Sequence, residues 1–122
     1  MPAPSGATDL PSLDEREFVM ISSTNSAVDP DAPSRFRYHE RDGVIWGEYW
    51  GDTVTFGRFV GTRRAHVLAV TFAHVTVTGG SVVTGASTST VEEGADGLRL
   101  VERFSIEGVD HESVCVEVVP GL

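Results

Sequence analysis

The residue with the clearest chemical potential is an acid on an apolar strand face. Glu102 lies in a run in which every second residue is apolar, so it shares a face with Leu98, Leu100, Phe104 and Ile106. A carboxyl group in that position must be hydrogen-bonded, paired with a cation or shifted upward in pKa. Glu102 is therefore a candidate general acid or base. The alternative is a structural carboxylate bonded to Arg58 or to a tyrosine hydroxyl.

A histidine occupies a similar position in an earlier run. His74 continues, at two-residue spacing, the apolar series Leu68, Val70 and Phe72. An imidazole on such a face could move a proton for a bound molecule. The alternative is a core histidine whose nitrogens are satisfied by hydrogen bonds.

Aromatic residues could form a binding surface beside these groups. Trp46 and Trp50 share the face of a run from 44 to 50 with Glu48, which makes Glu48 a further carboxylate candidate between two indole rings. Together with Tyr38 and Phe72, the tryptophans could line a cavity for a flat or apolar ligand. The alternative is ordinary filling of the core.

One arginine is a candidate for anchoring a ligand. Arg58 shares a predicted strand face with Val54, Phe56 and Val60. Its guanidinium could hold an anion or a carbonyl group of a ligand, or it could be the cation that pairs with Glu102.

Several kinds of site have no support in the sequence. The chain lacks a His/Cys/Asp cluster at zinc spacing, a glycine-rich phosphate loop before a helix, and a G-x-S-x-G motif. All nine basic residues counted as Lys or Arg are Arg, so Schiff-base chemistry on a lysine is excluded. The sequence predicts neither a metal nor a cofactor.

Three two-residue turn sequences mark the connections between the strands that must position these residues. Asp42-Gly43, Gly51-Asp52 and Gly79-Gly80 fit the primed two-residue turns that join antiparallel strands. Alternating apolar and polar residues between such signals predict eight strands, over residues 17–23, 35–41, 44–50, 53–61, 66–78, 81–91, 98–107 and 113–119.

Short sequential connections favour one closed architecture. We expect an all-β fold, a single antiparallel up-and-down barrel of eight strands, with a β-sandwich as the alternative. Gly47, Gly57 and Gly85 fall inside strands and indicate bulges or bends. Residues 1–15 are expected to be a disordered lead and residues 16–122 the barrel domain. The proline-containing segment 25–34 is expected to be a loop over one mouth of the barrel.

Composition narrows the partners and the compartment. The formal net charge of −9 and the absence of a basic stripe argue against nucleic acid or an anionic membrane as partner. No segment reads as a signal peptide or a membrane span, so a cytoplasmic location is expected.

Cys115 is the single cysteine, which excludes an intrachain disulfide and suggests an inert core or surface residue. The arginine-only, Val/Gly/Asp-rich composition suggests a high-GC bacterial source. A small apolar molecule in the barrel is the expected partner, and a homodimer stays open.

The stretch FRYHERDGVIWGEYWGD, followed later by TGASTSTVEEGADGLRLVERF, resembles a family of small bacterial proteins often labelled "N-acetylglutamate synthase". The similarity spans residues 36–119, and it departs from the family pattern where Gly97 meets Leu98 directly. Acetyl-CoA-dependent synthases need an α/β acyltransferase core, for which the sequence has no pattern. The resemblance implies a calycin-like small barrel and no known activity.

Two functions fit these expectations. The first is a cofactor-independent cyclase, isomerase or dehydratase that folds an apolar secondary metabolite against aromatic side chains and moves a proton with Glu102, His74 or Glu48. The second is a protein that binds or sequesters a small molecule without turnover. An ionisable group that points into the cavity with a perturbed pKa would favour the first.

Overall fold

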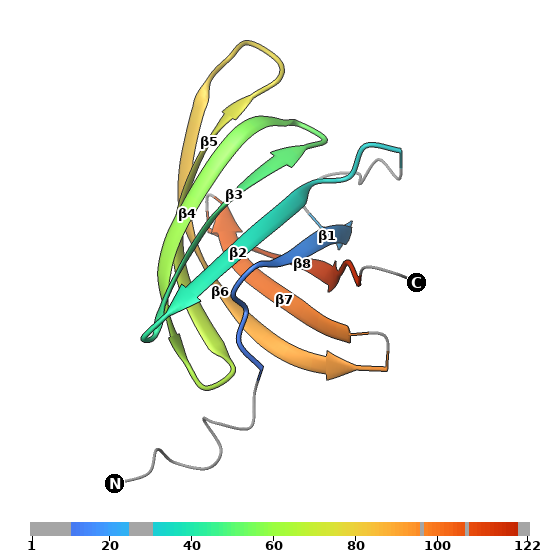
Figure 1. Cartoon of the computed structure of the whole chain (residues 1–122). Helices are drawn as coiled ribbons and strands as arrows, with labels where there is room; N and C mark the ends of the chain where they lie inside the picture. The colour runs from blue at the N-terminus through green and yellow to red at the C-terminus, as the bar shows by residue number, and fades with distance from the viewer. Residues whose placement is uncertain (1–10, 25–30, 96, 107, 120–122) are drawn as a thin grey trace, which may run out of the picture.

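Eight antiparallel strands follow one another in chain order around a closed barrel in the computed structural model, which describes residues 11–24, 31–95, 97–106 and 108–119 (Figure 1). The strands are β1 (Arg16–Ser23), β2 (Arg35–Arg41), β3 (Val44–Gly51), β4 (Val54–Arg64), β5 (Val67–Thr76), β6 (Val82–Gly94), β7 (Gly97–Ile106) and β8 (Val109–Glu117). Pairing of β1 with β8 closes the barrel, so each of these eight strands is paired on both sides. The predicted eight-stranded up-and-down barrel is confirmed, and the sandwich alternative is wrong.

The turn chemistry explains where the first hairpin closes. Asp42 and Gly43 both have positive φ, at 53° and 79°, as a primed two-residue turn requires, and they connect β2 directly to β3. The β5–β6 connection is longer than expected, because the ladder ends at the pair Val75 and Val82. The Thr76 hydroxyl donates to the Thr78 carbonyl oxygen and accepts from the Ser81 N–H, which completes a wider turn around the two glycines.

Two of the strand boundaries that differ from the sequence expectation do so for the same reason. β6 continues through Glu92 and Glu93 to Gly94, because these residues pair with the start of β7. β8 begins at Val109 rather than at residue 113, because Val109 pairs with Ile106 across the hairpin. Charged residues that read as loop in the sequence are thus placed in the ladder by their partner strands.

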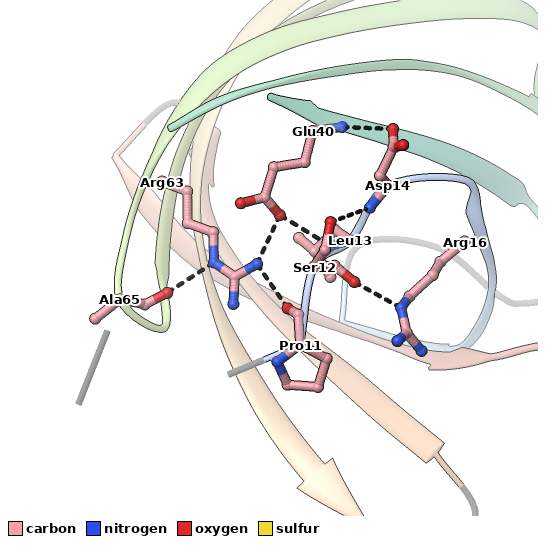
Figure 2. A network of polar contacts seen from close by, with 8 residues as sticks. All are labelled: Pro11, Ser12, Leu13, Asp14, Arg16, Glu40, Arg63 and Ala65. Atoms are coloured by element: carbon pink, nitrogen blue, oxygen red, sulfur yellow. Dashed lines mark hydrogen bonds and ion pairs between the residues drawn. The ribbon is translucent and has the colours of Figure 1, made fainter. Parts of the chain in front are cut away.

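The residues from 11 to 15, here called the N-terminal strap, close one end of the barrel. Leu13 is fully buried in the core cluster, and its N–H donates to Glu40 Oε1 over 2.8 Å. Arg63 Nη1 donates to the same oxygen over 2.7 Å and to the Pro11 carbonyl oxygen over 2.9 Å, as Figure 2 shows. The strap therefore packs across the end of the barrel formed by the β2–β3 and β4–β5 hairpins.

The strap corrects one domain expectation. A disordered lead was expected over residues 1–15, but residues 11–15 are hydrogen-bonded to the barrel, and Leu13 belongs to its core. Residues 1–10 lie outside the described residues, as do residues 25–30 of the expected loop over a mouth. Within the described part of the chain there is no helix long and apolar enough to cross a membrane.

Candidate functional site

One cavity of about 340 Å³ lies inside the barrel and opens at the end opposite to the strap. Its rim includes Ser34 before β2, Asp52 and Thr53 between β3 and β4, and the strand residue Thr84 near the start of β6. Its deeper lining includes Tyr38, Phe59, Val70, Ser89, Glu102 and Ser113. The barrel is thus filled at one end by core side chains, which include Leu13, and has an open cavity at the other end.

Aromatic side chains from β2 to β5 form one wall of this cavity. The rings of Phe36 and Tyr49 are stacked, with centroids 5.2 Å apart and planes 17° apart. Tyr38 contacts Phe59 at a centroid distance of 4.6 Å, and Phe72 is stacked on His74 at 6.2 Å. The aromatic wall consists of Phe36, Tyr38, Tyr49, Phe59, Phe72 and His74, all of which line the cavity.

Glycines on neighbouring strands make room for three of these rings. Gly47 pairs across the ladder with Phe59, Gly57 with Tyr49, and Gly85 with Phe72. A Cβ added at Gly57 would lie 2.5 Å from Tyr49 Cζ, and one added at Gly85 would lie 2.7 Å from Phe72 Cζ. Each ring therefore lies against the backbone of its partner strand, which is the close approach that a strand glycine permits. Rings held flat on the wall leave the centre of the barrel open.

A hydrogen bond joins the two polar members of this wall. Tyr49 Oη and His74 Nδ1 are 2.7 Å apart. Burial lowers the pKa of His74, and burial followed by the charge of Glu102 raises the pKa of Tyr49. Both groups are therefore neutral near pH 7. When the proton of the neutral His74 ring is on Nε2, the Tyr49 hydroxyl donates a hydrogen bond to Nδ1.

The opposite wall carries hydroxyl groups and one carboxyl group. Ser89 on β6, Glu102 on β7, Ser113 on β8 and Ser23 on β1 are consecutive partners across the ladder and so point to the same side of the sheet. Ser113 Oγ donates to Ser23 Oγ over 3.0 Å. The cavity therefore has an aromatic side and a polar side that face each other.

Glu102 is the ionisable centre of the polar side. Burial raises the pKa of its carboxyl group, and the Ser87 hydroxyl acts in the opposite direction. Ser87 Oγ is buried, two residues before Ser89 on β6. Burial, followed by the charges of Cys115 and then of Glu102, raises the pKa of Tyr38, which lines the same cavity.

Four of the residues singled out from the sequence meet in this cavity. Tyr38, Phe72, His74 and Glu102 all line it. The faces of β5 and β7 were read correctly, because Leu68, Val70, Leu98 and Leu100 are buried beside them. The catalytic and binding roles assigned to these residues stay predictions.

The other four predicted site residues are not in the cavity lining. The expectation that Trp46 and Trp50 line the cavity is wrong, because Ile45, Gly47 and Tyr49 take the inner face of β3. Trp46 is 40% exposed on the outer face and stacks on His39. The outer face is also the location of Glu48, which lies 4.0 Å from the His39 ring.

Arg58 is the fourth residue placed outside. A register shift between Val54 and Phe56 breaks the face that was expected to hold both, so Val54 is buried while Phe56 and Arg58 are exposed. The guanidinium carbon of Arg58 lies over the Phe56 ring, 5.4 Å from its centroid. Arg58 therefore neither pairs with Glu102 nor reaches a ligand in the cavity.

Sequence reasoning missed much of the lining. The lining residues Tyr49, Phe59 and Ser89 were not singled out from the sequence, although all three are buried. The signal that could have identified the two rings is their pairing with strand glycines, which follows from the register of the β3–β4 hairpin. No pattern in the sequence identified Ser113 as a lining residue.

A metal centre has no ligands among the described residues. No group of three or more His, Cys, Asp or Glu side chains in the described ranges is close enough to hold an ion. Cys115 is buried in the core cluster, which agrees with the expected core position rather than the surface position.

The fold and the cavity define a small antiparallel barrel of the class that holds one small molecule in its interior. More particularly, the chain belongs to the avidin-like protein family, described as "Avidin-like protein", whose model matches residues 11–118. No curated protein and no solved structure matches the chain significantly. The family membership agrees with the calycin-like barrel implied by the sequence resemblance and does not bear on the synthase label.

Proposed function

We propose that this protein binds one small, mainly apolar molecule inside the barrel. The observation that carries the proposal is the two-sided cavity, in which an aromatic wall faces Glu102 and a row of serine hydroxyls. A volume of about 340 Å³ is within the range of small-molecule sites, which are usually apolar with a few placed polar groups. The strap closes the far end, so a ligand enters from the rim at Ser34, Asp52 and Thr84.

The aromatic wall supplies most of the binding energy in this proposal. Rings held flat by glycine partners offer area to an apolar body without losing side-chain freedom when the ligand arrives. The polar wall then fixes which end of the ligand points toward β6, β7 and β8.

A calorimetric titration tests the binding function with a neutral probe, 2-(1-naphthyl)ethanol. Val70→Phe adds a ring in the cavity lining, whereas Thr71→Phe adds the same ring at the next, exposed position on the outer face. We expect the first change to weaken probe binding at least about 10-fold, or about 1.4 kcal/mol, and the second to leave it unchanged. Equal affinities for the two variants, with both folded by circular dichroism, would place the probe outside the barrel. Calorimetry suits this question because Trp46 and Trp50 lie away from the cavity.

Catalysis is a second candidate function, favoured by the presence of several acid–base groups in one cavity. A cyclase or isomerase needs no co-reactant if one group takes a proton from the substrate and the same or another group returns it elsewhere. Glu102, with its raised pKa, and the Tyr49–His74 pair are the groups that could do this. The substrate would be an apolar metabolite folded against the aromatic wall.

The catalytic candidate is tested on an identified ligand. Glu102→Gln keeps the size of the side chain and removes its proton transfer. A drop of about 10²-fold or more in turnover, with the ligand still bound and melting near normal, is the expected result. Full turnover by the variant would exclude Glu102 as the catalytic group.

A further inference from the structure

Glu102 is a cavity carboxylate without a cation of its own. The ion pairs between other described residues use separate carboxylates, as when Arg63 pairs with Glu40 and Arg16 with Glu117. None of the ion pairs found among the described residues includes Glu102, and no arginine lines the cavity. A carboxylate withdrawn from water is stabilised by hydrogen bonds or by an opposite charge.

The titratable groups around Glu102 supply no positive charge near neutral pH. Burial raises the pKa values of Tyr38 on β2, Tyr49 on β3 and Cys115 on β8, so all three stay protonated and neutral. Burial lowers the pKa of His74 on β5, which keeps the imidazole neutral. The lining residues from β1, β4 and β6 are not ionisable, and the remaining charged lining residue at the rim, Asp52, is an acid.

The surroundings of Glu102 favour a cation in two further ways. Aromatic faces attract positive charge through the ring quadrupole, and Tyr38, Tyr49 and Phe104 line the same cavity. The chain as a whole has a formal net charge of −9, which concentrates cations rather than anions near its surface. An anionic ligand would meet Glu102 and this field together.

We propose that the ligand is an amphiphilic amine, whose ammonium group pairs with Glu102 while its apolar body lies against the aromatic wall. The proposal rests on the binding function above and names the chemistry of the ligand. The Ser87 hydroxyl, which favours the charged form of Glu102, and Ser89, opposite Glu102 on the ladder, can orient the carboxylate. The ammonium group would donate a charge-assisted hydrogen bond to the Glu102 carboxylate, which no cationic side chain among the described residues supplies.

Three probes with one ring system separate this proposal from its alternatives. They are 2-(1-naphthyl)ethylamine, 2-(1-naphthyl)ethanol and 1-naphthylacetic acid, titrated into the full chain at pH 7.5. We expect the amine to bind roughly 10- to 100-fold more tightly than the alcohol, because a charged hydrogen bond contributes about 1.5–3 kcal/mol. The acid should bind most weakly of the three.

A pair of glutamate variants assigns the preference to the cavity. Glu102→Gln should reduce the ratio of amine to alcohol affinity to about one while leaving the alcohol bound. Glu48→Gln removes the same charge from the outer face and should keep the ratio unchanged. Lowering the pH from 8 to 5 should weaken amine binding as Glu102 takes up a proton, and this dependence should be absent in Glu102→Gln.

The remaining outcomes would overturn either the amine proposal alone or both proposals. Equal binding of amine and alcohol, or a preference that survives Glu102→Gln, would overturn the amine proposal and leave the binding cavity intact. Failure of all three probes to bind would count against the cavity as a binding site and therefore against both proposals. Melting curves of each variant show that the compared chains are folded.

Discussion

Replacing Arg63 with methionine should detach the N-terminal strap from the barrel. The arginine side chain is 7% exposed and donates to the carbonyl oxygens of Ala65 and Pro11 as well as to Glu40. Methionine fills similar space and has none of these donors. The change therefore leaves the Glu40 carboxylate, itself only 17% exposed, with the Leu13 N–H as its remaining partner in this network.

The expected loss follows from the burial of this pair. Removing one member of a buried ion pair costs about 3–5 kcal/mol, and the bond from Leu13 places the estimate at the lower end. For a chain of this length, about 3 kcal/mol corresponds to a fall of roughly 10–20 °C in melting temperature. Thermal and urea unfolding of the full chain measure both quantities.

A double-mutant cycle separates the pair from the packing of the arginine stem. Arg63→Met combined with Glu40→Gln should be less destabilising than the sum of the single changes, with a coupling of at least about 1 kcal/mol. Arg103→Met is the matched control, because Arg103 pairs with Glu112 in an exposed position where an ion pair is worth less than about 1 kcal/mol. Equal losses for the two arginine variants, with an additive double variant, would refute a strap held by a buried pair.

Two further outcomes test the interior. Gly57→Ala should cost about 1–3 kcal/mol in urea unfolding and weaken probe binding, because its Cβ would lie 2.5 Å from Tyr49 Cζ and 2.8 Å from His74 Cβ. Gly94→Ala should cost less, because its Cβ would lie 3.2 Å from the Gly97 carbonyl oxygen, and the opposite order would contradict the glycine–ring packing. Cys115 is 5% exposed, and burial raises the pKa of its thiol. A disulfide reagent at pH 8 should therefore label this thiol only after the chain unfolds. If the native chain were labelled at a rate within about tenfold of the rate in urea, the core would open readily and the prediction would be wrong.

The sequence alone was sufficient for the class of fold and for two of the inner faces. The Asp42-Gly43 turn depends on local backbone chemistry, so its position follows from the two residues themselves. On β5 and β7 one face carries the larger apolar side chains, and a single ionisable residue interrupts each of these two faces. For this reason His74 and Glu102 could be assigned to the interior before any partner strand was known.

The face of β3 could not be read in the same way. Trp46 and Trp50 alternate with Ile45 and Tyr49, so both faces of the strand are rich in apolar or aromatic residues, and periodicity does not distinguish them. The choice is made by β4, where Gly57 accommodates the ring of Tyr49. A shift in register near Val54 then reverses the inner and outer residues of β4.

The strap and the polar wall depended on tertiary structure entirely. Leu13 is one apolar residue in a segment rich in proline and serine, and its burial requires the end of the barrel that Glu40 and Arg63 help to form. Ser89 and Ser113 are ordinary strand residues until closure of the barrel places them on either side of Glu102. Alternation along one strand reports what shares a face, whereas the cavity is made by side chains of neighbouring strands, whose register is decided only when the sheet pairs and closes.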